Sequence, residues 1–401
     1  MNTTSLDPPP GLPLAEAGPR SETPSPPATA TAVANPHRRN WIARAYRAGD
    51  VAWERLFGLA SLIVGLAVVA TLPVVQLLSL GYLLEAGGRV ARSGRLRDGI
   101  VGTRKAARLG GIVLGARLVL LPLQIAAGFR TDAHLIAPDS PAAVGWTIAV
   151  ALLTVLSVLW IAAACWRGGR LRHFLWPRPL RFLLDVRKRG SYRRARDAVS
   201  RFVAELRLPH YFSLGLRGFI GGLIWLAVPA TLLALGAKAP LAAVLGALLL
   251  AWALFYVPFV QIRMAAENRF SAIFEARAVR RAYARAPLAF VFALAVTLLF
   301  ALPLYLLKIE LVPREAAWLP SLLFVVFIFP ARLLCGWAVA RGQRRLRSRH
   351  WVFRILGRTI VLPVVALYVL IVYISPILSW HGLLSLYEQH ALLVPVPFLG
   401  L

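Results

Sequence analysis

Acidic residues are scarce in this chain of 401 residues, in which 17 Asp and Glu face 46 Lys and Arg and leave a net charge of +29. None of the acidic residues falls inside a long apolar run. General acid–base enzymes need positioned titratable groups, and proton- or sodium-coupled carriers commonly place a carboxylate near the middle of the membrane. The composition therefore argues against an enzyme and lowers the case for a coupled transporter.

Cysteine is nearly absent as well, because only Cys165 and Cys335 occur. Two such distant thiols exclude a disulfide framework, and they lack the spacing of a zinc site. The histidines show no H-E-x-x-H or H-x-x-E-H spacing, and no phosphate-binding glycine motif is present. The sequence predicts no metal ion and no cofactor.

Long apolar runs, in contrast, are abundant. Hydrophobic residues make up 58% of the sequence and charged residues 16%, whereas soluble domains have about 45–50% and about 25%. Runs long enough to cross about 30 Å of hydrocarbon lie near residues 56–84, 111–129, 144–165, 214–236, 240–262, 287–307, 318–340 and 359–380. We expect an all-α, polytopic integral membrane helical bundle.

The first run, residues 56–84, is too long for one untilted crossing, because its helix would extend about 43 Å. Pro73 lies near its middle, where proline removes a helical hydrogen bond. A break there would make a re-entrant hairpin whose two short arms return to the same membrane face. We therefore predict about seven crossings plus an N-terminal re-entrant hairpin. The alternative is that residues 56–84 form one long crossing.

The basic residues are divided unequally between the two sides that this arrangement defines. Segments 1–55, 85–110, 166–213, 263–286 and 341–358 hold 39 of the 46 Lys and Arg, and the opposite side holds four. Because cytoplasmic loops are enriched in Lys and Arg, the basic side is predicted to be cytoplasmic. The N-terminus would then lie inside, and the C-terminus outside, a plasma membrane of the bacterial inner-membrane type.

Three regions follow from composition. Residues 1–40 are rich in proline and poor in apolar side chains, so we expect a disordered cytoplasmic tail. Residues 41–380 would form the helical membrane domain, with a basic cytoplasmic loop at 166–213. Residues 381–401 would form an extracytoplasmic tail.

Helical periodicity also occurs within the basic segments. In the long loop it involves Ala195, Val199, Phe202, Val203 and Leu206, with i,i+4 charge pairs Asp197–Arg201 and Arg201–Glu205. A similar stretch precedes the hairpin at residues 42–57, and residues 268–285 form a weaker third. We expect interfacial amphipathic helices, which could bind anionic phospholipids or only anchor the loops. No basic domain stands apart from the membrane, so no nucleic-acid partner is expected.

Three arginines lie inside predicted crossings: Arg117, Arg217 and Arg332. A guanidinium at the centre of a membrane helix costs at least about 2.5 kcal/mol, so such residues usually face protein, water or an anionic ligand. These three are the candidate ligand- or lipid-binding residues. The alternative interpretation is that they reach the inner head groups by snorkelling, most simply for Arg117 and Arg217, which lie nearer the cytoplasmic ends of their runs.

Two stretches resemble a membrane protein family of unknown function, number 4013 in the domain-of-unknown-function series. The first is Leu72-Pro73, followed by Leu80-Gly81-Tyr82-Leu83-Leu84-Glu85 and by Arg89-Val90-Ala91-Arg92-Ser93-Gly94. The second is Arg263-Met264-Ala265-Ala266-Glu267-Asn268-Arg269-Phe270. The resemblance covers about a quarter of the chain and implies an apolar hairpin that leads into a basic turn. It implies no catalytic residue, because the family has no assigned activity.

The sequence favours a non-enzymatic integral membrane protein whose basic cytoplasmic face engages anionic lipids, a membrane protein partner or a second copy of the chain. The alternative is a carrier or permease for an anionic or lipidic substrate, with the three span arginines along its path. These hypotheses predict different structures. Convergence of the three guanidinium groups on one enclosed cavity would favour the carrier, and three separate side chains that reach the inner surface would favour the first.

Overall fold

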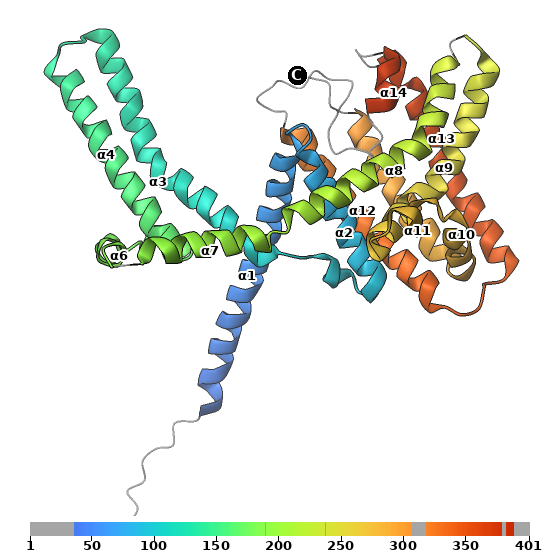
Figure 1. Ribbon diagram of the computed structural model, residues 1–401, viewed down its shortest axis with the longest axis horizontal. Helices are drawn as coiled ribbons and strands as arrows, with labels where there is room; N and C mark the ends of the chain where they lie inside the picture. The colour runs from blue at the N-terminus through green and yellow to red at the C-terminus, as the bar shows by residue number, and fades with distance from the viewer. Residues whose placement is uncertain (1–35, 189, 237, 307–317, 379–381, 389–401) are drawn as a thin grey trace, which may run out of the picture. The chain divides into compact units, whose positions relative to one another are not determined.

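The computed structural model describes residues 36–388, except for residues 189, 237, 307–317 and 379–381. All secondary structure in these ranges is helical, which confirms the all-α fold (Figure 1). The chain divides into two units, residues 1–50 and 51–401. Helix α1 (Pro36–Ala70) begins inside the segment expected to be disordered, and the stretch at 42–57 is part of this long helix rather than a separate interfacial one.

Among the described residues, eight helices are long and apolar enough to cross a membrane. They are the apolar part of α1 (Ala52–Ala70), α3 (Thr103–Ile136), α4 (Pro141–Trp166), α8 (Leu208–Leu235), α9 (Pro240–Glu267), α11 (Pro287–Leu306), α12 (Trp318–Arg344) and α13 (Trp351–Leu378). Each overlaps one of the apolar runs in the sequence, and the run at 56–84 is divided between α1 and α2. The chain is therefore compatible with a multi-pass membrane protein, as the hydropathy predicts.

Shorter helices connect these long ones. They are α2 (Gln76–Ser93), η1 (Leu96–Gly99), α5 (Leu171–Leu175), α6 (Pro179–Val186), α7 (Ser191–Glu205), η2 (Phe270–Phe274), α10 (Ala276–Arg285), η4 (Gly382–Leu384) and α14 (Ser385–Glu388). The basic loop at 166–213 thus contains α5, α6, α7 and the first turn of α8.

Helix α7 confirms the periodicity found in the long loop, but its predicted charge pairs are wrong. Asp197 pairs with Arg196, and Arg201 donates to the backbone carbonyl of Asp197 instead of its carboxylate. Glu205 pairs with Lys105 at 3.1 Å. Exposed i,i+4 pairs are worth only about 0.3–0.5 kcal/mol, so other partners readily replace them. Here these partners are Arg196, the backbone of α7 and Lys105 of α3.

The chain breaks where Pro73 predicts, between the end of α1 at Ala70 and the start of α2 at Gln76. Ser79 Oγ donates to the carbonyl oxygen of Leu66 at 2.8 Å, so the two arms contact each other close to the turn. The predicted short arms are wrong, however. The apolar part of α1 is long enough to cross a membrane, and α2 continues beyond Leu84 to a length of about 27 Å.

Helix α2 is mostly buried and packs against α8, α9 and α12. Glycines allow the backbones to approach closely. A Cβ on Gly81 would lie 1.8 Å from the carbonyl oxygen of Tyr211, and one on Gly215 would lie 1.9 Å from that of Leu77. Small residues commonly mediate such contacts between membrane helices. The helix that the sequence presents as half of a hairpin is therefore at the centre of the packing.

Helices α3 and α4 run side by side in Figure 1, where α3 is drawn in turquoise and α4 in green. Phe129 stacks on Trp146 at 5.1 Å near the turn that joins them. At the other end, Gly115 faces the ring of Phe174 in α5, and Trp160 Nε1 donates to the carbonyl oxygen of Phe174 at 2.8 Å. Gly111 and Gly115 of α3 thus allow α5 and the residues before it to approach closely.

Segments that carry the predicted cytoplasmic charge meet at one end of the helices. Arg92 donates to the carbonyl oxygens of Ala265 and Ala266 at 3.1 and 2.9 Å. The backbone N–H of Arg349 donates to the carbonyl oxygen of Ala284 at 2.9 Å. We call this region, made of residues 85–102, 263–286 and 341–350, the basic end. Because the chain turns between α1 and α2, residues 85–102 lie at the same end of the helices as the other two segments.

Candidate functional site

Arg332 is the most deeply buried of the three span arginines, with 0% of its surface exposed. It lies on α12, and its Nη1 donates to Oε1 of Gln261 on α9 at 2.7 Å. Nε2 of Gln261 in turn donates to the carbonyl oxygen of Gly218 on α8 at 3.1 Å. Because a buried polar group is costly without partners, this chain of hydrogen bonds ties three long helices together.

The other two arginines lie in different surroundings. Arg217 on α8 is half-buried, and its Nη1 is 3.5 Å from Oδ1 of Asn268, at the corner that follows α9. Arg117 on α3 is exposed. The structure therefore does not bring the three predicted residues together, and none of them lines the two arginine-lined depressions described below.

Glu85 is a buried carboxylate that sequence reasoning placed at the start of a loop. It lies within α2, is 7% exposed, and accepts from Arg89 Nε at 2.8 Å and from Arg92 Nη2 at 3.0 Å. His210 Nε2 on α8 lies 3.6 Å from its other oxygen. The helical spacing of Glu85, Arg89 and Arg92 was the signal that could have identified this cluster.

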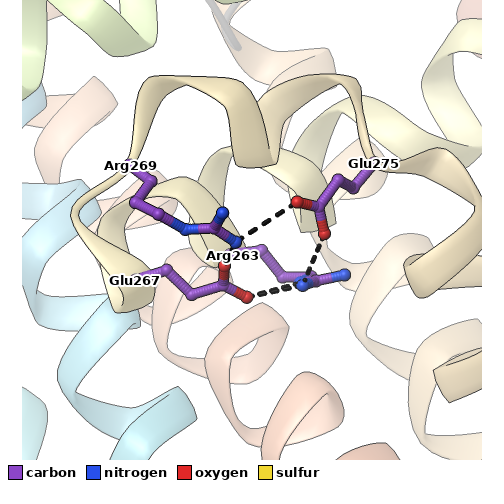
Figure 2. Close-up of polar contacts among 4 residues, drawn as sticks. All are labelled: Arg263, Glu267, Arg269 and Glu275. Carbon is purple, nitrogen blue, oxygen red and sulfur yellow. Dashed lines mark hydrogen bonds and ion pairs between the residues drawn. The ribbon is translucent and has the colours of Figure 1, made fainter.

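A second ionic network closes the corner between α9 and α10 (Figure 2). Arg263 lies between two carboxylates, with its Nη2 3.0 Å from Glu275 Oε2 and also bonded to Glu267. Arg269 joins the same two glutamates from the other side, at 3.2 Å from Glu275. The bond to Glu267 raises the pKa of Arg269, so its cation is stabilised. Asn268 has a positive φ of 51°, which lets the chain turn sharply inside this network.

Helix α10 leaves this corner and carries four arginines, Arg277, Arg280, Arg281 and Arg285. Its buried residues are Val279 and Ala282, and a Cβ on Gly342 of α12 would lie 2.7 Å from the carbonyl oxygen of Ala282. Residues 268–285 thus contain the amphipathic helix that the sequence predicts. Its apolar side, however, packs on protein rather than lying directly on lipid.

Two arginine-lined depressions adjoin α10 at the basic end. The first, which we call the Trp337 depression, has a volume of about 220 Å³ and is lined by Ala286, Pro287, Leu288, Ala289, Trp337, Arg341, Arg345, Arg349 and Phe353. The second, the Gln343 depression, has a volume of about 200 Å³ and is lined by Arg263, Ala278, Arg281, Ala282, Arg285, Gly342 and Gln343. Among the residues that the structure describes, no acidic side chain lines either one.

The Trp337 depression holds its guanidinium groups against aromatic rings. The guanidinium carbon of Arg341 is 5.2 Å from the centre of the Trp337 ring system, and that of Arg349 is 5.5 Å from the Phe353 ring. Such cation–π contacts orient the planar groups. Oriented guanidinium groups bind phosphate and carboxylate oxygens with paired hydrogen bonds, so the depression can hold an anionic group.

Among the described residues, no cluster of three or more His, Cys, Asp and Glu has an arrangement that could hold a metal ion. No family model, curated protein or solved structure matches this chain. The resemblance to the family of unknown function therefore stays a prediction. The arginine-lined depressions of the basic end are the arrangement from which a function can be argued.

Proposed function

We propose that this protein is a non-enzymatic integral membrane protein whose basic end binds the head groups of anionic phospholipids on the cytoplasmic side of a plasma membrane. The observation that carries this proposal is the pair of arginine-lined depressions beside α10. Among the described residues their linings contain six arginines and no acidic side chain, and only Arg263 is paired with carboxylates, those of Glu267 and Glu275. Anionic lipids give the cytoplasmic surface a negative potential, and each Lys or Arg near it contributes about 1 kcal/mol of attraction.

The position of the depressions supports a lipid head group over a soluble anion. Trp337 and Phe353 belong to the long apolar helices α12 and α13, and Leu288 of the Trp337 depression is 53% exposed at the start of α11. Tryptophan is enriched at the level of lipid head groups. A phosphate in this depression would therefore have apolar neighbours on the membrane side, where acyl chains could lie.

Retention of phosphatidylglycerol by the purified full-length protein tests the proposal. Detergent-purified protein is expected to keep this lipid in preference to phosphatidylcholine, as counted by native mass spectrometry. The double variant Arg345→Gln/Arg349→Gln is expected to lose roughly thirtyfold in affinity, because two charges worth about 1 kcal/mol each are removed. Higher salt should weaken retention in the wild type, since exposed charges are screened.

The matched control is Arg130→Gln, which removes one of the few basic residues on the opposite, predicted extracytoplasmic side. Its retention of phosphatidylglycerol should equal that of the wild type. If the double variant retains the lipid as well as the wild type does, the head-group function is wrong. A partner complex or homo-oligomer assembled on the basic end would then be the better explanation.

A further inference from the structure

A third cavity, larger than the two depressions, lies on another side of α10. It has a volume of about 400 Å³ and is enclosed by parts of α9, α10, α11 and α13; we call it the Trp252 cavity. Its lining residues are Trp252, Phe255, Tyr256, Phe259, Val279, Arg280, Tyr283, Phe290, Val291, Leu294, Arg358 and Val361. Ligand pockets of proteins commonly have about 300–1,000 Å³, so the volume suits a small molecule or part of a larger one.

The wall of the Trp252 cavity is mainly aromatic and is built from packed side chains. Phe259 and Phe290 contact each other at 4.5 Å between ring centres, and both are almost fully buried. Trp252 lies against Tyr256 at 5.3 Å but keeps 52% of its surface exposed. The wall therefore has a closed inner part and an open outer part, both apolar.

The charge is concentrated in two side chains. Arg280 and Arg358 line the cavity, and both are exposed. No acidic residue is found among the described residues of its lining. The guanidinium carbon of Arg358 is 5.5 Å from the centre of the Tyr283 ring. The Tyr283 hydroxyl donates to the carbonyl oxygen of Arg354 at 2.7 Å, and burial raises the pKa of Tyr283, so the phenol stays neutral. The polar part of the cavity is thus cationic.

The charged and apolar parts occupy different depths along the helices. Arg280 is in the basic end, and Arg358 is in the first part of α13. Trp252 is 15 residues before the end of α9 at Glu267, which corresponds to about 22 Å along the helix. A molecule that fills the cavity therefore meets cations near the basic end and aromatic rings farther along α9.

We propose that the Trp252 cavity binds one anionic membrane lipid, with its phosphate at Arg280 and Arg358 and one acyl chain along the aromatic wall of α9. This inference rests on the proposed function, because it names a specific lipid site that adjoins the same basic end. The two kinds of site differ in what they bind. The depressions hold only a lipid head group at the surface, whereas the Trp252 cavity holds the head group and one acyl chain.

Quenching of Trp252 by a brominated lipid tests the proposal, because bromine on an acyl chain quenches tryptophan only near contact. The full-length protein is reconstituted in phosphatidylcholine nanodiscs that contain a small fraction of phosphatidylglycerol with brominated chains. The Trp252 contribution is the difference from Trp252→Phe. We expect brominated phosphatidylglycerol to quench it at a roughly tenfold lower mole fraction than brominated phosphatidylcholine.

The variant Arg280→Gln/Arg358→Gln should remove this preference, and its exposed positions make misfolding a small risk. The matched control is Arg277→Gln, an exposed arginine of the same helix that does not line the cavity. Its preference should be unchanged. Inorganic phosphate should not reverse the quenching, because a free anion lacks the chain that the wall binds.

Equal quenching by the two brominated lipids would overturn the proposal, since the cavity would then face bulk lipid without selecting one. Reversal by inorganic phosphate would also overturn it and would identify a simple anion site. Either result is distinguishable from failure of the proposed function. Lipid retention that depends on Arg345 and Arg349 can persist when the quenching of Trp252 is not selective. Selective quenching of Trp252 can likewise persist when lipid retention does not depend on Arg345 and Arg349.

Discussion

At the scale of single residues, charge is stabilised in this molecule by a few buried or half-buried partners. Glu85 accepts hydrogen bonds from two arginines on its own helix, and one of these, Arg92, also binds two carbonyl oxygens near the end of α9. The carboxylate therefore orients a side chain that joins α2 to α9. An arginine aimed at carbonyl oxygens needs a nearby anion to hold it in place.

Replacing Glu85 with Gln is expected to destabilise the protein by about 1–3 kcal/mol, because a charged hydrogen-bond acceptor is lost from a nearly buried position. The measurement is the thermal unfolding midpoint in detergent. Asp98→Asn is the control, since the Arg97–Asp98 pair is exposed and 3.8 Å apart. That variant should change stability by less than about 0.5 kcal/mol. Equal midpoints for the two variants would contradict a structural role of Glu85.

The three span arginines show how far residue-level reasoning from the sequence can reach. Arg332 is fully buried and faces protein, which is one of the surroundings that the cost of a buried guanidinium allows. Its partner Gln261 lies 71 positions away in the chain, on another helix, so no local pattern could identify it. The exposed Arg117 has the same sequence signature of a basic residue in an apolar run. Only tertiary packing separates the two cases.

At the scale of helices, glycine contacts determine how closely α2 approaches its neighbours. Gly81 and Gly215 each face a carbonyl oxygen of the opposite helix, at distances that exclude a methyl group. Gly336 of α12 makes a similar contact, with a Cβ position 2.2 Å from the carbonyl oxygen of Gly87. Helix α2 is therefore held on both the α8 and the α12 side by backbone contacts.

The substitution Gly81→Ala is expected to destabilise the protein by about 1–3 kcal/mol or more, because the backbones of α2 and α8 must move apart. Gly128→Ala on α3 is the matched control, since nothing lies within 4 Å of the Cβ position there. Alanine favours a helix over glycine by about 1 kcal/mol, so the control should be neutral or stabilising. The two variants are compared by their thermal unfolding midpoints, with size-exclusion chromatography used to measure the folded fraction after heating. A Gly81→Ala variant as stable as the control would show that α2 and α8 separate easily.

The helices themselves could be predicted from the sequence, but the position of α2 could not. Pro73 marks the break, and the apolar runs give the long helices, because both depend on local chemistry. The second arm was expected to end near Leu84, since Glu85 and Arg89 looked like the start of a loop. Both residues instead lie within α2, where they pair with each other at 2.8 Å. Charged residues such as Glu85, Arg89 and Arg92 therefore look the same in the sequence whether they end a buried helix or begin a loop.

At the scale of the whole molecule, the distribution of charge and the packing of the segments support each other. The sequence assigns segments 85–110, 263–286 and 341–358 to one side from the order of the apolar runs and the distribution of Lys and Arg. In the structure, contacts between residues 85–102, 263–286 and 341–350 place these parts at one end of the helices. At the other end, Thr231 of α8 lies 2.8 Å from the hydroxyl of Tyr387, in the predicted extracytoplasmic tail. Arginine distribution predicts that the first end is cytoplasmic.

Cysteine labelling tests this orientation directly. With Cys165 and Cys335 replaced by Ala, single cysteines at Ser348, at Ser200 of α7 and at Asp139 between α3 and α4 all lie at exposed positions. An impermeant thiol reagent added to intact cells should label Asp139→Cys and should label Ser200→Cys and Ser348→Cys only after permeabilisation. The prediction follows from the high cost of moving many guanidinium groups across hydrocarbon. Labelling of Ser200→Cys in intact cells would place the arginine-rich loop outside, and the lipid sites argued from the basic end would then face a different leaflet.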